Sequence, residues 1–163
     1  MRGLIIVLAA SLLAACGFHL RGDYSLPWDT LYIGLPEYDS LRADLKRTIE
    51  ATTRTRVVGE GQTSQATLVI LRNEALRNIL SLDAKGNQRE IQLTRAFAFR
   101  LQDSQGKALG PAVQILLQRD MTYDENLIYA KQGEEATIQR EMQDDLVQQL
   151  MRRLAAFKPA PAP

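Results

Sequence analysis

The sequence EIQLTRAFAFRLQ, residues 90–102, alternates large apolar and polar side chains. One set of alternate positions is apolar: Ile91, Leu93, Phe97, Phe99 and Leu101. The other set is mostly polar: Glu90, Gln92, Thr94, Arg100 and Gln102. Successive side chains of a strand point to opposite faces, so this pattern predicts a strand with one buried face. Arg95 interrupts the apolar set and is expected either to contact a partner or to extend to the sheet edge.

Turn-forming residues flank this strand on both sides, at 84–87 and 103–107. Beyond the turns, residues 66–83 and 113–121 also place apolar side chains at alternate positions. The three segments therefore predict a meander of long antiparallel strands. The middle of the first strand, residues 73–78, is more polar and is expected to bulge or bend.

The rest of the chain supplies shorter strands and two helices. The expected elements are a strand at 30–35, a helix capped by Ser40, a strand at 56–58, a loop at 123–133 and a helix from Glu134. This order predicts an α+β fold, with a mostly antiparallel four- to five-stranded sheet and two helices packed on one face.

The amino-terminal residues have the pattern of a bacterial lipoprotein leader. Arg2 precedes an apolar run at 3–13, which is too short to span a bilayer, where roughly 20 residues are needed. The run ends in Leu-Ala-Ala-Cys, and Cys16 is the only cysteine. Because a thiolate is a strong nucleophile, Cys16 is expected to take an S-diacylglyceryl group, and its amine, freed by cleavage, an N-palmitoyl chain.

This interpretation divides the chain into four parts. They are a cleaved signal peptide at 1–15, a lipidated tether at 16–29, a single domain at 30–157 and a flexible Pro/Ala tail at 158–163. Residue 17 is glycine rather than the aspartate that retains lipoproteins at the inner membrane, so the expected location is the periplasmic side of the outer membrane of a Gram-negative bacterium. The anchored chain would carry equal numbers of basic and acidic residues, 19 of each, which argues against a nucleic-acid partner.

No catalytic set is evident, and we expect no enzyme activity. The only histidine, His19, has no nearby ligand or nucleophile to form a metal or catalytic site. There is no Gly-rich phosphate loop and no Cys-x-x-Cys motif. A carboxylate pair distant in sequence, as in a lipid-tethered hydrolase, stays open as an alternative. No metal and no cofactor is expected besides the covalent lipid on Cys16.

Basic residues near two connections are candidate ligand contacts. Lys85 lies in the turn after the first long strand and Arg89 just beyond it, while Lys131 lies in the apolar segment 126–133. One interpretation is an amphipathic ligand site, with the cations on acidic head groups and Leu127, Ile128 and Tyr129 on apolar surface. The alternative is that turn lysines only increase solubility and the segment folds onto the core. Asp83 is expected to reduce the positive potential at Lys85.

Three passages resemble the LptE (RlpB) family of lipopolysaccharide-assembly lipoproteins. They are residues 13–22, with Cys-Gly-Phe-His-Leu-Arg; the Lys-Gly-Asn turn at 85–87 with the strand that follows; and residues 123–154, with Tyr-Asp-Glu-Asn and the spaced residues of the last helix. Together they cover most of the chain after the leader.

The resemblance implies that the protein is a plug and assembly partner, one to one, of the β-barrel LptD. The pair inserts lipopolysaccharide into the outer leaflet, and the lipoprotein is thought to contact that lipid. The resemblance also implies that Lys85 and Lys131 contact lipopolysaccharide phosphates. The alternative function is a stand-alone envelope lipoprotein that binds or carries an amphipathic lipid.

Overall fold

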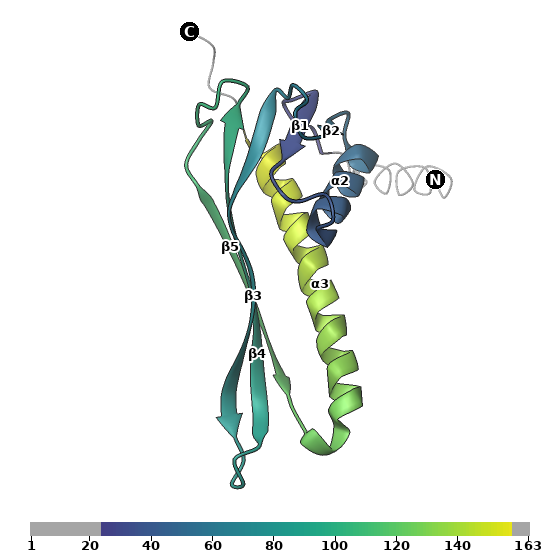
Figure 1. Cartoon of the computed structure of the whole chain (residues 1–163), viewed down its shortest axis with the longest axis vertical. Coiled ribbons are helices and arrows are strands. Elements are labelled where there is room, and N and C mark those ends of the chain that lie inside the picture. Colours follow the sequence, from purple (N-terminus) through teal and green to yellow (C-terminus); the bar gives the residue numbers. More distant parts are fainter. Residues whose placement is uncertain (1–23, 158–163) are drawn as a thin grey trace, which may run out of the picture.

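The computed structural model describes residues 24–157, and the leader, Cys16 and the tail lie outside them. Figure 1 gives the arrangement of the elements along the chain. The elements are β1 (Thr30–Ile33), α2 (Ser40–Thr52), β2 (Arg56–Val58), β3 (Ala66–Leu82), β4 (Gln88–Asp103), β5 (Val113–Thr122), the 3₁₀ turn η1 (Glu125–Leu127) and α3 (Ile128–Ala155). None of the helices in this part of the chain is long and apolar enough to cross a bilayer.

The five strands form one sheet in the order β2-β1-β3-β4-β5. The pairs β3–β4 and β4–β5 are antiparallel, whereas β1 runs parallel to both β2 and β3. Both helices lie on the same side of the sheet (Figure 1). The predicted α+β class, with a mostly antiparallel sheet and two helices on one face, is confirmed.

The sheet is wide at one end and narrow at the other. β1 pairs only with the first residues of β3, Ala66 to Leu68, so further along only β3, β4 and β5 continue. A single long helix, α3, accompanies these three strands to their far end (Figure 1). We call that far end, made of residues 82–90 and 122–131, the distal end.

The alternation in β4 correctly predicted the core. Its five large apolar residues, Ile91 to Leu101, are all buried, and α3 covers them with an apolar stripe. The buried residues of α3 are Met142, Leu146, Val147, Leu150, Met151 and Leu154. On the opposite face of β4, Thr94, Ala96 and Ala98 are also buried, because small side chains on a central strand lie below their larger neighbours.

The bulges of β3 lie beside the predicted segment rather than within it. Pairing between β3 and β4 shifts between Ile70 and Arg72 and again between Ile79 and Ser81. The extra residues are Leu71 and Leu80, on either side of 73–78. These large side chains are about half exposed, so a bulge there costs no core contact.

Two predicted helix starts were wrong. Asp39, not Ser40, caps α2, because its carboxylate accepts a hydrogen bond from the Leu41 amide at 2.8 Å. The last helix begins at Ile128 rather than Glu134, so most of the predicted loop 123–133 is helical. Ala130, Lys131 and Gln132 are good helix formers, and Gly133 is the only residue of this segment with a large helix penalty.

Part of the predicted tether belongs to the folded domain. Trp28 is buried, and its ring lies 5.8 Å from that of Phe157. Tyr24 and Leu26 also pack against the core. The described domain therefore includes residues before β1.

Candidate functional site

The distal end brings together basic residues from two separate parts of the sequence. The connection after β5 is tied to the start of β4, because the Tyr123 amide donates to the Arg89 carbonyl at 2.8 Å. Glu90 pairs with Thr122 in the same place. The β3–β4 hairpin, which holds Lys85 and Arg89, and the start of α3, which holds Lys131, therefore share one end of the molecule (Figure 1).

Lys85 lies in a rigid turn built around Asp83. The carboxylate of Asp83 accepts hydrogen bonds from the backbone amides of Lys85, at 2.7 Å, and Asn87, at 2.9 Å. Gly86 closes the turn with a φ of +87°, a backbone conformation that favours glycine. These hydrogen bonds, that from the Asn87 amide first, lower the pKa of Asp83. Asp83 is thus a structural acceptor for the turn that presents Lys85.

The β4–β5 connection contains a turn with the same hydrogen bonds. Asp103 accepts the amides of Gln105 and Lys107 at 2.9 Å each, and Gly106 has a φ of +78°. This turn lies at the opposite end of the strands (Figure 1). Lys107 is therefore an internal control for Lys85: a lysine in the same kind of turn, at the other end of the molecule.

The three basic residues of the distal end differ in their freedom to bind a ligand. The Lys131 ammonium lies 2.8 Å from the Glu134 carboxylate and 3.2 Å from the Thr122 hydroxyl, and only 16% of its side chain is exposed. Lys85 and Arg89 are exposed, and within residues 24–157 neither forms an ion pair. Lys85 and Arg89 are the more available cations.

Apolar side chains lie exposed at the same end. Leu82 ends β3, Leu127 ends η1 and caps α3, and Ile128 and Tyr129 are the first residues of α3. Tyr129 is 88% exposed, and the other three are between 42% and 55% exposed. Isolated exposed apolar residues are common, but four of them at the same end of the molecule as two exposed cations give that end an amphipathic character. The sequence predicted the members 127–129 but not Leu82.

Arg77 fixes the distal end and was not predicted from the sequence. Its guanidinium donates to the Gln88 side chain at 2.7 Å, lies 3.4 Å from the Glu135 carboxylate and stacks 5.2 Å from the centre of the Tyr123 ring. It thus joins β3, β4 and α3. In the sequence Arg77 is one of several charged residues in a polar segment, and no pattern indicates that Gln88, Glu135 and Tyr123 are its partners.

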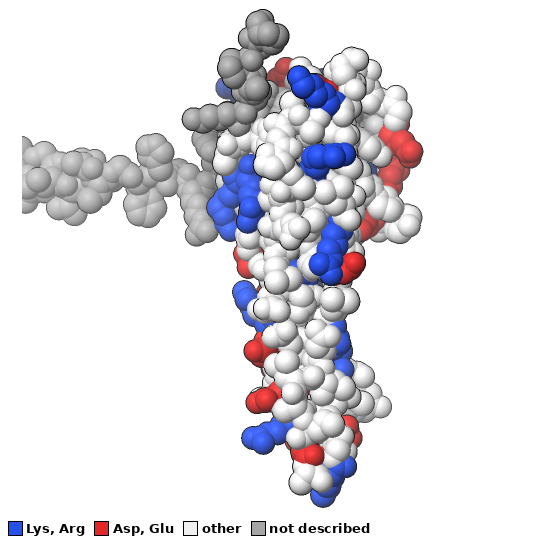
Figure 2. Space-filling model, turned by 90° about the vertical axis from the view of Figure 1, so that its left-hand side faces the viewer, with Lys and Arg blue, Asp and Glu red and all other residues white. Residues whose placement is uncertain are grey.

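The charged surface of the rest of the molecule is mixed. Figure 2 shows Lys and Arg side chains interspersed with Asp and Glu along the face in view, with no large region of one sign. Within the described part of the chain, no group of three or more histidine, cysteine or carboxylate side chains is placed to hold a metal ion.

A family model described as LptE, lipopolysaccharide-assembly, matches residues 28–154. No curated protein matches the chain. Among solved structures, lipoprotein B from Nitrosomonas europaea is 35% identical with a TM-score of 0.73, and the match covers 86% of this chain and 92% of that one.

Two crystal structures of lower identity have the same fold. A minor lipoprotein from Acinetobacter baumannii is 24% identical with a TM-score of 0.67, over 84% of this chain and 99% of that one. The rare lipoprotein B from Shewanella oneidensis is 20% identical with a TM-score of 0.64, over 78% of this chain and 94% of that one.

Proposed function

The chain belongs to the LptE family of lipopolysaccharide-assembly lipoproteins, and we propose that it is the plug and assembly partner of the outer-membrane barrel LptD. The family match over 28–154 carries this proposal, because it spans nearly the whole described domain. Membership makes the protein an envelope lipoprotein of lipopolysaccharide assembly, in a family without enzymatic activity. The barrel partner, the lipid contact and the outer-membrane location are proposed here.

The surface of the domain suits the lumen of a barrel. The interior of a large membrane barrel is polar, so a plug needs a wet surface with mixed charges rather than an apolar one. The mixed face in Figure 2 supports this role. So does the outer face of the sheet, which no other element of residues 24–157 covers (Figure 1).

We propose that the distal end contacts lipopolysaccharide through both kinds of surface. Lys85 and Arg89 offer donors for charge-assisted hydrogen bonds to phosphate groups. Leu82 and the residues 127–129 offer apolar surface for acyl chains. Lys131 contributes to this site in a second way, because its ion pair with Glu134 holds the first turn of α3 in place.

The anchor is proposed to be the lipidated Cys16, which lies outside the described residues. Each buried methylene contributes about 0.8 kcal/mol to membrane binding, and stable anchoring needs two signals. Three acyl chains would therefore hold the protein permanently. Cys16→Ala should leave the fold unchanged, as judged by circular dichroism, and remove the lipid, as judged by the intact mass. A Cys16→Ala protein that still carried the lipid mass would refute this assignment.

The partnership is tested by purifying the tagged, lipidated protein from detergent-solubilised envelopes and identifying what accompanies it by mass. The proposal predicts a large β-barrel protein in near one-to-one amount. Recovery of the protein alone, or with lipid only, would contradict the plug and favour the stand-alone lipid carrier.

A further inference from the structure

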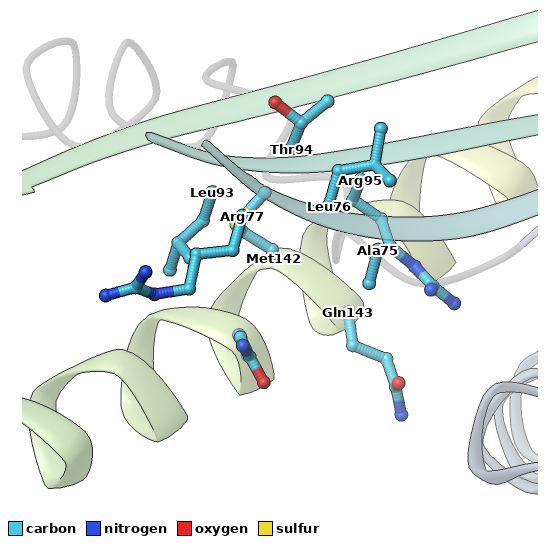
Figure 3. Close-up of a pocket in the computed structure, with 9 residues that line it drawn as sticks. Ala75, Leu76, Arg77, Leu93, Thr94, Arg95, Met142 and Gln143 are labelled. Carbon is cyan, nitrogen blue, oxygen red and sulfur yellow. The ribbon is translucent and has the colours of Figure 1, made fainter. Parts of the chain in front are cut away.

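A cavity of about 200 Å³ lies halfway along the molecule, between α3 and the strands β3 and β4 (Figure 3). The cavity is present because two paired residues of β3 and β4 leave part of the space between the sheet and α3 unfilled. Ala75 and Arg95 are directly paired across β3 and β4, at a point where the neighbouring inward positions of β4 carry Leu93 and Phe97. Alanine is too small and arginine too polar to complete the core there.

The cavity has apolar walls and a cation at one side. Leu93 and Met142 are buried and face it from the sheet and from α3. The guanidinium of Arg95 extends past Ala75 on the side near Gln143, and Arg77 lies on the other side (Figure 3). An apolar hole with charge at its rim is the form of site that binds an amphiphile.

Most of the hydrogen-bond donors of Arg95 have no partner among the described residues. Within the described chain its one hydrogen bond runs from Nη2 to the Asn73 side-chain oxygen, at 2.7 Å, and it has no ion pair. A guanidinium carries five N–H donors. Partial burial lowers the pKa of Arg95, while the charge of Asp39 raises it. The Asn73 side chain that binds Arg95 donates in turn to the Asp39 carboxylate at 3.3 Å, so hydrogen bonding links Asp39 to Arg95 only through this amide. The remaining guanidinium donors are free to bind a further anion.

Two other polar side chains at the rim, Gln143 and Arg77, already have partners, whereas the buried Thr94 hydroxyl has none and carries no charge. The Gln143 amide donates to Asp44 at 2.6 Å and accepts from Ser40 at 3.3 Å. Arg77 is held by Gln88 and Glu135 at the distal side. Arg95 is therefore the group at this rim that is most able to bind a new anion.

We propose that this cavity binds a single aliphatic chain with an anionic head group, with the chain between Leu93 and Met142 and the head group on Arg95. A cavity of about 150 Å³ accepts a benzene-sized molecule, so this one admits a short alkyl segment but not a multi-chain lipid. The site is separate from the distal end, since neither Lys85 nor Arg89 lines it. It goes beyond the proposed lipopolysaccharide contact and does not depend on it.

The test uses the full chain in phosphatidylcholine nanodiscs, with ¹³C-methyl-labelled methionine, titrated with octyl phosphate. The proposal predicts a saturable shift of the Met142 methyl signal. Octanoate should give the same shift, inorganic phosphate no shift, and octyl glucoside a shift only at higher concentration. Equal effects of phosphate alone would mean an anion site without a chain, and no saturable shift would overturn the proposal.

Variants separate the cavity from general partitioning into the nanodisc. Arg95→Gln should weaken octyl phosphate binding at least about tenfold and leave octyl glucoside unchanged, because charge-assisted hydrogen bonds to the head group are lost. Arg119→Gln is the control, since Arg119 lies on the same face of the sheet, paired with Leu93 across the strands, but outside the cavity lining. Equal effects of the two variants would contradict the proposal.

Ala75→Leu fills the cavity and should abolish binding of both octyl compounds; if it does not fold, the Arg95→Gln comparison still decides. The double variant Lys85→Glu/Arg89→Glu should leave octyl phosphate binding unchanged. A loss of binding in this double variant would place the ligand at the distal end and overturn the cavity site. Failure of lipopolysaccharide binding alone would leave the cavity proposal intact.

Discussion

Asp83 and Lys85 illustrate how a side chain's role depends on its hydrogen bonds. From the sequence, Asp83 was expected to oppose the charge of Lys85. In the structure its carboxylate accepts the backbone amides of Lys85 and Asn87, and it organises the turn. The sequence could not predict this, because an aspartate before a glycine-containing turn is equally compatible with a carboxylate that points into solvent.

The Asp83 turn should loosen in acid. Its folded pKa is lowered, so its contribution is fully present above the usual value near 3.8 and is lost as the pH falls through the lower folded value. We expect the amides of Lys85 and Asn87 to exchange with solvent faster below that range. Asp83→Ala should give fast exchange at neutral pH, measured by NMR, with the Asp103 turn unaffected. Unchanged exchange of both amides in Asp83→Ala would contradict this account.

Gly34 is required for close packing of the first strand against the third. A Cβ at this position would lie 2.9 Å from the Leu68 carbonyl oxygen, which accepts the Gly34 amide at the same distance. We expect Gly34→Ala to lower the free energy of unfolding by about 1–3 kcal/mol, because backbone has to move. Urea unfolding measures this. Gly59→Ala is the control, since its nearest atoms are 3.9 Å away on a side chain; an equal loss there would argue against the clash.

The elements differ in how far their sequences determined them. β4 was predicted well because its inward and outward faces differ strongly, and its buried residues are those of the pattern. The bulges at Leu71 and Leu80 were missed, because β3 beyond Leu68 is an edge strand whose side chains are mostly exposed and none of them fully buried. Without a buried face, the sequence pattern carries little information about register.

The first turns of α3 were missed for a related reason. From Ile128 to Gly133 the helix buries no residue, so it shows no apolar stripe. Intrinsic helix propensity and the Lys131–Glu134 pair support it instead. The exposed apolar residues there looked like a loop in the sequence, which predicted them as members of a ligand site but did not predict that they lie at the same end of the molecule as the β3–β4 hairpin.

The packing of α3 on the sheet can be tested at Leu146. This side chain is fully buried in the centre of the apolar stripe. Leu146→Ala should lower the free energy of unfolding by about 2–5 kcal/mol, because it removes apolar contacts and leaves a cavity. Leu116→Ala on the outer face of β5, where Leu116 is 61% exposed, should cost less than about 0.5 kcal/mol. Denaturant titration measures the free energy of unfolding of both variants. Similar decreases in the two variants would mean that the outer face of the sheet is also covered.

At the scale of the whole molecule, the two equivalent turns, built around Asp83 and Asp103, lie at opposite ends of the strands. Of the candidate site, the sequence predicted the residue types and three of the segments, 85–89, 127–129 and Lys131. It could not predict that they lie at the same end of the molecule, because their placement depends on the lengths of β3, β4 and β5 and on their register. The ion pair between Lys131 and Glu134 was likewise not predicted from the sequence, although the i,i+3 spacing of the two residues is compatible with it.

The central claim, that the distal end contacts lipopolysaccharide, is tested most directly by photo-crosslinking in growing cells. A photoreactive amino acid replaces Lys85 in one variant and Lys107, in the matched turn at the other end, in a second. Both positions are exposed and both turns keep their aspartate and glycine. If the distal end contacts lipopolysaccharide, position 85 should crosslink to it strongly and position 107 should give few crosslinks. Equal crosslinking from both positions, or crosslinking from 107 alone, would contradict the claim.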